Sequence, residues 1–411
     1  MIGAGLAGLS AAIRLTQRGY CVTLSETGPQ AGGRCRSYFD PQLGMEIDNG
    51  NHLVLSGNRA VHDYLATIGA QDRLTGPGEA SFPFMDMRND RRWTLHPNAG
   101  RVPWWVLARS RRVPGTTPRD YLPLRRLIGA HPDRTVGEVL STQGALWDKL
   151  LEPLFVSALN TPAAEGSAAL AGAIVDETLG QGGRASAPRI AGPSLAAAFV
   201  DPALAWLRGN GAEVRLGRRL RALELAEDRV ATLAFADGDK PVSTGEPVVL
   251  AVPSWVAAEM MPGLSVPTEH NPIVNAHFRF TSPPGAEPIV GLVGGDAEWV
   301  FAFPDRLSTT TSAAARLEGV EREELARRLW AEVAQVHHLS APLPPWQIVR
   351  ERRATFAATP EQDRLRPPAA TSLANLWLAG DWTQTGLPAT IEGAIRSGAT
   401  AATMAAQHVP A

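Results

Sequence analysis

The first eight residues carry three glycines with the spacing of a dinucleotide-binding turn. Gly3, Gly5 and Gly8 form the pattern G-x-G-x-x-G, and Leu6 and Ala7 separate the last two glycines. In such a site one glycine makes the tight turn after the first strand, one lets the backbone approach a pyrophosphate, and one lets helix and strand pack closely. We therefore expect a dinucleotide phosphate at the start of the helix that follows.

An acidic residue follows the glycine turn at a suitable distance. Residues 20–26 read as a strand, which would place Cys21 in the core, and Glu26 lies 18 residues after Gly8 (26 − 8). This is close to the roughly 20 residues expected for the acid that binds a ribose hydroxyl. A carboxylate here disfavours a 2′-phosphate, so NADP is not expected at this site.

The first strand is short. Only Met1 and Ile2 precede Gly3, whereas strands usually have about 5–6 residues. We therefore expect that a few residues are missing before Met1, which leaves the central strand of the sheet short.

Two further segments near the start of the chain carry groups for an anion and a flat ring. Gly33 and Arg34 follow the Glu26 strand, and an arginine after a glycine pair can bind a phosphate through two parallel hydrogen bonds. Gly50 and Asn51 lie in a polar loop that can place amides against a heterocycle. His52 in the same loop is our candidate for the acid or for a residue that orients the substrate, with a packing role as the alternative. Among the carboxylates, Asp48 is the next candidate acid.

The end of the chain supplies a comparable set. A strand over 377–382 ends in Gly380 and Asp381, and a helix opens near Thr390 and Ile391. The N-terminus of a helix offers free N–H groups and a positive dipole end, which would stabilise the negative charge of a reduced flavin. Gly393, Gly398 and the alanines of this helix would allow it to approach the sheet closely. An ordinary helix rich in small residues is the alternative.

These segments, together with the strand end at Val252, resemble in order the FAD-dependent amine oxidase and carotenoid desaturase superfamily. The resemblance covers the whole chain. It implies an α/β fold in which a Rossmann-like FAD-binding domain of the amine oxidase type is interleaved with a mixed α+β substrate domain. It also implies residue roles toward FAD: Glu26 on the adenosine ribose, Arg34 near the pyrophosphate, Gly380 and Asp381 at the ribityl–phosphate end, and Thr390 and Ile391 under the pyrimidine ring. Gly33, Gly50, Asn51 and Val252 complete the expected FAD contacts.

Within that superfamily the chain is most similar to the squalene-associated branch, the hydroxysqualene dehydroxylases of bacterial hopanoid synthesis. The segments that carry this similarity are 48–58, 152–162 and 353–357. The resemblance implies that hydroxysqualene is reduced to squalene by hydride from flavin with loss of water. NADPH or NADH in transit, or a partner reductase, would supply the electrons, because no second G-x-G-x-x-G is present. Aromatic residues are candidates for an apolar substrate tunnel, with a plain core as the alternative: Phe82, Phe84, Trp104, Trp105, Phe155, Trp299, Phe301 and Phe303.

Three rival functions stay open at this point. A carotenoid or phytoene desaturase would transfer hydride the other way, from lipid to oxidised FAD. An amine oxidase would need an aromatic cage, for which Trp382 is the one suggestive residue. A flavin-binding lipid carrier would have no turnover.

The elements that must position these residues come from several parts of the chain. With 411 residues two domains are expected: an FAD-binding domain of 1–58, 195–258 and 372–411, and a substrate domain of 59–194 and 259–371. Periodicity predicts strands near 213–216, 230–235, 248–253, 275–280, 289–293 and 299–303, and helices over 196–209 and about 325–336.

Composition limits the partners. The net charge is −2, and the two cysteines form no disulfide framework, so nucleic acid is not expected and a reduced, cytoplasmic setting is. We expect no metal site, and no apolar run is long enough to span a membrane.

Residues 101–112 combine paired tryptophans with arginines, which suits peripheral contact with the inner face of the cell membrane. A partly buried segment that lines the substrate domain is the alternative.

Overall fold

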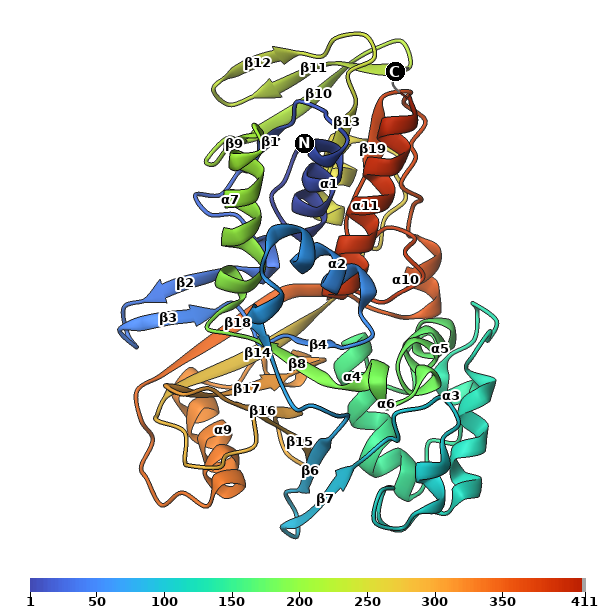
Figure 1. Cartoon of the computed structure of the whole chain (residues 1–411), viewed down its shortest axis with the longest axis vertical. Helices are drawn as coiled ribbons and strands as arrows, with labels where there is room; N and C mark the ends of the chain where they lie inside the picture. Colours follow the sequence, from blue (N-terminus) through green and yellow to red (C-terminus); the bar gives the residue numbers. More distant parts are fainter. Residues whose placement is uncertain (409–411) are drawn as a thin grey trace.

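The computed structural model describes residues 1–408, in which helices and strands alternate along the chain (Figure 1). The α-helices are α1 (Leu6–Gln17), α2 (Arg59–Ile68), α3 (Val136–Val139), α4 (Glu152–Leu159), α5 (Ala168–Glu177), α6 (Gly183–Ser186), α7 (Asp201–Gly209), α8 (Ser254–Met260), α9 (Arg322–His337), α10 (Pro360–Arg364) and α11 (Ile391–His408). The strands are β1 (Thr23–Ser25), β2 (Ser37–Asp40), β3 (Met45–Asp48), β4 (Leu53–Leu55), β5 (Leu74–Thr75), β6 (Phe82–Asp86), β7 (Arg91–Leu95), β8 (Pro188–Ala191), β9 (Glu213–Arg215), β10 (Leu220–Ala226), β11 (Arg229–Phe235), β12 (Gly238–Pro241), β13 (Val248–Leu250), β14 (His270–Arg279), β15 (Ile289–Val293), β16 (Trp299–Ala302), β17 (Arg306–Thr311), β18 (Trp346–Phe356) and β19 (Leu376–Leu378).

A parallel layer joins segments that are distant in the sequence. β1 pairs with β9 and β13 pairs with β19, both in parallel. Ile2 connects the two pairs, because it forms parallel bridges with Ser25 and with Leu250. The layer therefore takes strands from each of the three segments assigned to the FAD-binding domain, although the domain boundaries themselves stay a prediction.

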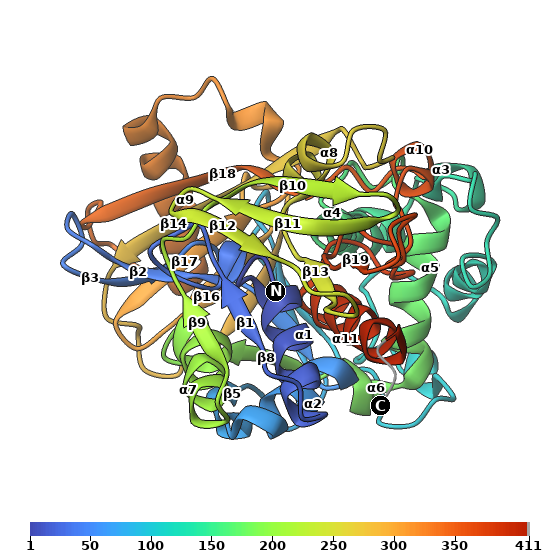
Figure 2. The same cartoon turned by 90° about the horizontal axis from the view of Figure 1, so that it is seen from above.

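The first and last long helices lie against each other beside this layer, and Figure 2 shows α1 and α11 side by side. Ser10 on α1 donates a hydrogen bond to the carbonyl of Ile395 at 2.8 Å. A Cβ added to Gly398 would lie 2.1 Å from the carbonyl oxygen of Ala7. The expectation that Gly398 packs on the sheet is therefore wrong, because the close approach is between the two helices.

A second, larger sheet forms the centre of the remaining structure. Its strand order is β18-β14-β17-β16-β15-β6-β7, and its neighbours are antiparallel except for β15 and β6. Side chains alternate across the strands, so Val274, Ala276 and Phe278 pack with the apolar side of α9. Trp299 and Phe301 belong instead to the largest buried apolar cluster.

Most expected elements are present, although β13 ends at Leu250 where a strand to 253 was expected, and β19 ends at Leu378 where a strand to 382 was expected. β15 has the predicted bounds, β14 is longer than expected, and α9 carries the predicted helical period. The strand expected over 20–26 is reduced to Thr23–Ser25, and Cys21 is exposed because it precedes the paired residues. Within residues 1–408 no helix is both long and apolar enough to cross a bilayer.

Candidate active site

The three glycines of the first turn have three different environments. Gly3 has φ +97°, and a Cβ there would lie 2.3 Å from the carbonyl oxygen of Ala251. A Cβ on Gly8 would lie 1.9 Å from the carbonyl oxygen of Gly3. By contrast, a Cβ on Gly5 would meet no atom within 4 Å. Gly3 and Gly8 thus permit the turn and the helix packing, while Gly5 borders open space that a phosphate can approach.

The N-terminus of α1 faces the same place. Gly5 is the N-cap and no side chain caps the helix. The side chains of Leu6 and Ala7 are buried, so the backbone N–H groups of the first turn are the groups left for an anion.

Glu26 stands at the end of β1, beside this turn. Its two carboxylate oxygens accept hydrogen bonds from the N–H of Ala4 and the N–H of Gly28, each at 2.8 Å. These bonds fix the carboxylate next to the glycine turn. Because an ionised carboxylate has about four acceptor positions, capacity remains for a ribose hydroxyl.

Arg34 and Asp381 meet although 347 positions separate them. Arg34 lies in the short helix η1 (Gly33–Cys35), preceded by Gly32 at φ +106°. Its guanidinium donates to the Asp381 carboxylate at 2.6 Å and to the carbonyl of Ala354 at 2.6 Å. Asp381 is buried, whereas the Arg34 side chain is 42 % exposed. The arginine therefore holds the two ends of the chain together and still presents one side outward.

The polar loop after β3 touches the large sheet. A Cβ on Gly50 would lie 2.8 Å from the side-chain nitrogen of Asn275 on β14. The backbone N–H of Asn51 donates to Asn275 Oδ1 at 3.3 Å, and the side-chain amide of Asn51 donates to Thr310 Oγ1 at 3.1 Å. Asn51 Oδ1 is buried and has no partner within residues 1–408. An N–H of a bound heterocycle would satisfy this oxygen.

The two candidate acids differ in their surroundings. The pKa of His52 is lowered to about 4, first by burial and then by the charge of Arg34, which a hydrogen bond to the Arg34 backbone only partly offsets. His52 is therefore neutral near pH 7 and can donate an N–H bond but not act as imidazolium. Asp48 accepts bonds from Ser37, from the N–H of Leu195 and from Arg306. Both Asp48 oxygens are engaged, so its contacts are those of a structural carboxylate.

Val252 and Gly380 lie together at the ends of β13 and β19. The indole N–H of Trp382 donates to the Val252 carbonyl at 2.9 Å. Gly380 has φ +155°, and a Cβ there would lie 2.3 Å from the same indole nitrogen. Trp382 is buried, and it closes the space beside Gly380.

Ile391 is the first residue of α11 and Thr390 precedes it, close to where the helix start was expected. The Thr390 hydroxyl accepts a hydrogen bond from the N–H of Gly393 at 3.0 Å, as a helix cap does. Ile391 is buried against the parallel layer. These contacts place both residues at the start of α11.

One buried arginine was not predicted. Arg366 is only 2 % exposed and donates to the carbonyl of Asp381 at 3.1 Å, to the Thr385 hydroxyl at 2.7 Å and to the Thr383 carbonyl. It thereby fixes the loop that carries Asp381. A single arginine in a proline-containing loop gives no pattern by which sequence reasoning could find it.

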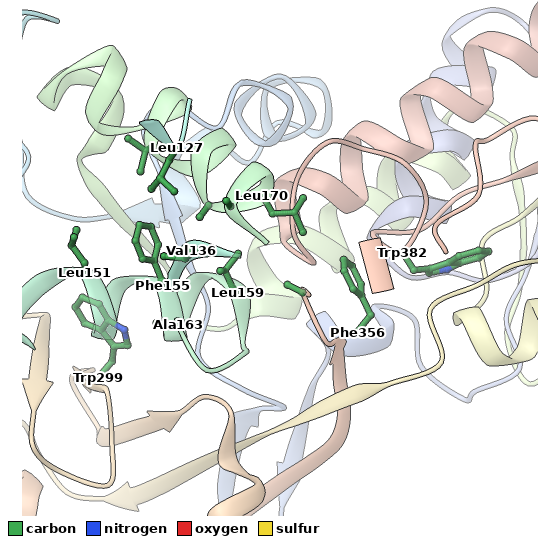
Figure 3. Close-up of a cluster of buried hydrophobic side chains, with 14 of the residues drawn as sticks. Leu127, Val136, Leu151, Phe155, Leu159, Ala163, Leu170, Trp299, Phe356 and Trp382 are labelled. Atoms are coloured by element: carbon green, nitrogen blue, oxygen red, sulfur yellow. The ribbon is translucent and has the colours of Figure 1, made fainter. Parts of the chain in front are cut away.

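Six of the eight aromatic tunnel candidates are buried, and a seventh is partly buried. Phe84, Trp105, Phe155, Trp299, Phe301 and Phe303 belong to the largest buried apolar cluster, and Phe82 packs against it. Figure 3 shows the cluster from Leu127 through Phe155 and Leu159 toward Phe356 and Trp382. Trp104 is the exception, since it is 50 % exposed and lies on the surface.

The residues present fit FAD. The open side of Gly5, the uncapped start of α1 and the carboxylate of Glu26 suit a pyrophosphate and a ribose. The unsatisfied Asn51 oxygen suits a polar ring, and the buried apolar cluster borders the same region through Trp382.

Comparison with known proteins agrees with this geometry. Residues 6–405 match the family of flavin containing amine oxidoreductases. The chain belongs to this family, which supports FAD as its cofactor.

Two relatives are similar to this chain in sequence, and one solved structure is similar to it in fold. The chain is 49 % identical over 408 residues to a hydroxysqualene dehydroxylase of Zymomonas mobilis, covering 99 % of both chains. It is 52 % identical over 404 residues to a hydroxysqualene dehydroxylase of Rhodopseudomonas palustris, covering 98 % of this chain and 96 % of the relative. Its fold is similar to that of a putrescine oxidase variant, with a TM-score of 0.72, 16 % identity, and coverage of 99 % of this chain and 98 % of the other.

Proposed function

We propose that this protein is an FAD-dependent oxidoreductase that converts hydroxysqualene to squalene in hopanoid synthesis. The observation that carries the proposal is identity near 50 % to hydroxysqualene dehydroxylases over almost the whole of both chains. The buried apolar cluster beside the predicted flavin site supports a long isoprenoid substrate.

The reaction breaks the allylic C–O bond, adds hydride to carbon and releases the oxygen as water, with one proton taken up from solvent because neutral His52 does not supply it. Reduced FAD, when bound, supplies the hydride. The chain must bind the cofactor, keep the site dry and orient the hydroxyl. Apolar packing around Phe356 and Trp382 excludes water, and the N–H of neutral His52 orients the leaving hydroxyl.

The source of electrons and the place of action belong to the same proposal. NADPH or NADH in transit is the donor we favour, because the chain has a single G-x-G-x-x-G. We also propose a cytoplasmic protein at the inner face of the cell membrane, since the substrate is a membrane lipid by its chemistry.

Product analysis tests the function. Purified holoprotein with a reductant is given hydroxysqualene, squalene, phytoene or an amine in separate reactions, and products are identified by mass spectrometry. We expect squalene from hydroxysqualene and no product from the others. A desaturated product from phytoene or an aldehyde from the amine would overturn the proposal in favour of a desaturase or an amine oxidase.

His52 has its own test. His52→Ala should keep the flavin spectrum and slow dehydroxylation by about tenfold, the scale of losing one hydrogen bond between neutral groups. His52→Gln, which keeps an N–H donor, should fall between. Because the pKa of His52 is about 4, the rate should show no His52 titration from about pH 6 to about pH 8. Wild-type rates in His52→Ala would reduce His52 to packing.

A further inference from the structure

Large apolar side chains are concentrated on the surface of residues 101–128, which we call the 101–128 surface. This segment contains the short helices η3 (Trp104–Leu107) and η4 (Pro118–Arg126). Five of the large hydrophobic side chains exposed within the described part of the chain lie here: Val102 (76 % exposed), Trp104 (50 %), Leu107 (68 %), Leu122 (62 %) and Ile128 (44 %). Apolar patches of this kind usually mark an interaction site.

The same surface is strongly basic. Residues 101–128 contain seven arginines and one carboxylate, a net charge of +6 (7 − 1), in a chain whose total is −2. None of these arginines has a carboxylate within ion-pair distance anywhere in residues 1–408: Arg101, Arg109, Arg111, Arg112, Arg119, Arg125 and Arg126. Their charge is therefore available to an anionic partner.

The apolar side chains are held outward by a fixed framework. Asn98 donates to the Val102 carbonyl at 3.0 Å and accepts from the N–H of Trp105 at 3.2 Å. The Trp105 ring packs edge-on against Tyr121 with centroids 5.2 Å apart. The Tyr121 hydroxyl accepts from the N–H of Val113 at 3.0 Å. Trp105 and Tyr121 fill the buried side of this segment. The exposure of Trp104 is therefore part of the folded arrangement.

The inner side of this segment joins the substrate region. Trp105, Tyr121 and Leu127 belong to the same buried apolar cluster as Phe356 and Trp382, and Figure 3 shows this cluster extending from Leu127 toward Trp382. The segment between β7 and α3 also lies at the opposite end of the molecule from the β10–β12 sheet (Figure 1). The buried side of the 101–128 segment therefore packs on apolar side chains of the same cluster that reaches the predicted flavin site.

We propose that the 101–128 surface docks on an anionic lipid bilayer. Tryptophan and leucine enter the boundary between headgroups and acyl chains, and the arginines, whose hydrogen-bond partners are neutral groups, bind the lipid phosphates. An anionic bilayer matches this surface better than a folded protein partner does, because seven arginines with a single carboxylate require an extended surface of negative charge. Lipid docking stands on this surface alone, and delivery of the isoprenoid from the bilayer to the site rests on the proposed function.

Flotation of the holoprotein with vesicles tests the proposal. The vesicles contain phosphatidylcholine alone, or phosphatidylcholine mixed with phosphatidylglycerol. We expect the wild type to float with the anionic vesicles, more weakly with the neutral ones, and less as salt is raised. The double variant Trp104→Asp, Leu107→Asp and the double variant Arg125→Glu, Arg126→Glu should each lose about tenfold or more of the anionic-vesicle binding.

The matched control is Leu225→Asp, which changes a 55 % exposed leucine on β10. This variant should float like the wild type. A wild type that binds no anionic vesicles, or a Trp104→Asp, Leu107→Asp variant that floats as well as the wild type, would overturn the proposal. Turnover of detergent-dispersed hydroxysqualene is measured in parallel and should be the same in all variants. A protein that floats without any turnover would contradict the proposed function and leave the docking surface standing.

Discussion

At the scale of single residues, Gly5 is the position where a side chain would meet a cofactor and nothing else. A Cβ on Gly5 has open space within 4 Å, and the backbone there needs no positive φ. Gly5→Val should therefore fold normally and lose FAD, because the branched side chain occupies the space of the pyrophosphate. Flavin absorbance per protein and the melting temperature of the flavin-free form measure the two effects.

Gly209→Val is the control for Gly5→Val. A Cβ on Gly209 also meets no atom within 4 Å, but Gly209 ends α7 outside the predicted site. The Gly209→Val protein should retain FAD and remain yellow. A yellow Gly5→Val protein would contradict the phosphate site at α1.

Glu26 carries the ribose contact and also two backbone contacts. Glu26→Gln keeps the shape of the side chain. It replaces one of the two acceptor oxygens with an NH2 group and removes the negative charge. We expect FAD affinity to fall by about 1–3 kcal/mol, roughly the scale of a hydrogen bond to a charged group. Titration of the flavin-free protein with FAD measures this. If Glu26→Gln binds FAD as tightly as the wild type, Glu26 serves only the turn.

The sequence predicts these local residues better than the residues that support them. Glycine roles depend on spacing within a few positions, and the structure places Gly3, Gly5 and Gly8 accordingly. Asn275 and Arg366 act through contacts formed only after folding. Neither contact leaves a local pattern, so neither residue could be predicted.

At the scale of elements, β14 and β17 enclose a histidine that destabilises the protein in acid. His277 is fully buried, its Nδ1 lies 2.8 Å from Ser308 Oγ, and its pKa is lowered to about 3 by burial and by Arg306. The unfolded chain binds a proton near pH 6.5 and the folded chain does not. The contribution of His277 to the free energy of unfolding should therefore fall by about 1.4 kcal/mol per pH unit below about pH 6.5.

His277→Gln removes this titration. Urea unfolding of the holoprotein between about pH 7 and about pH 5 should show a shallower loss of stability in the variant, by the equivalent of one proton. Equal slopes for wild type and His277→Gln would mean that His277 is already protonated, or exposed, in the folded protein.

Element type was predictable where one face of a segment is buried. The repeat of Leu325, Leu329, Val333 and Val336 predicts α9, and all four side chains are buried. Residues 20–22 have strand-like composition but lie outside the pairing of β1 with β9. Composition alone does not show where a partner strand ends, which is why the boundary and the burial of Cys21 were misjudged.

At the scale of the whole molecule, the site is made by chain ends that fold together. Arg34 reaches Asp381, and Ile2 lies between Ser25 and Leu250 in the parallel layer. The order of motifs along the chain predicted this closure only through resemblance to a family. Membrane contact of residues 101–112 was expected from their tryptophans and arginines and stays a prediction. Which of the two tryptophans is buried could not be predicted, because Trp105 is buried through its packing with Tyr121.

The direction of hydride flow is the central claim, and anaerobic reoxidation tests it most directly. The flavin of the holoprotein is reduced with dithionite, excess reductant is removed, and hydroxysqualene is added without oxygen. We predict that the oxidised flavin spectrum returns and that squalene forms in an amount equal to the flavin. Flavin that stays reduced, or oxidised flavin that is bleached by a lipid donor such as phytoene, would contradict the account.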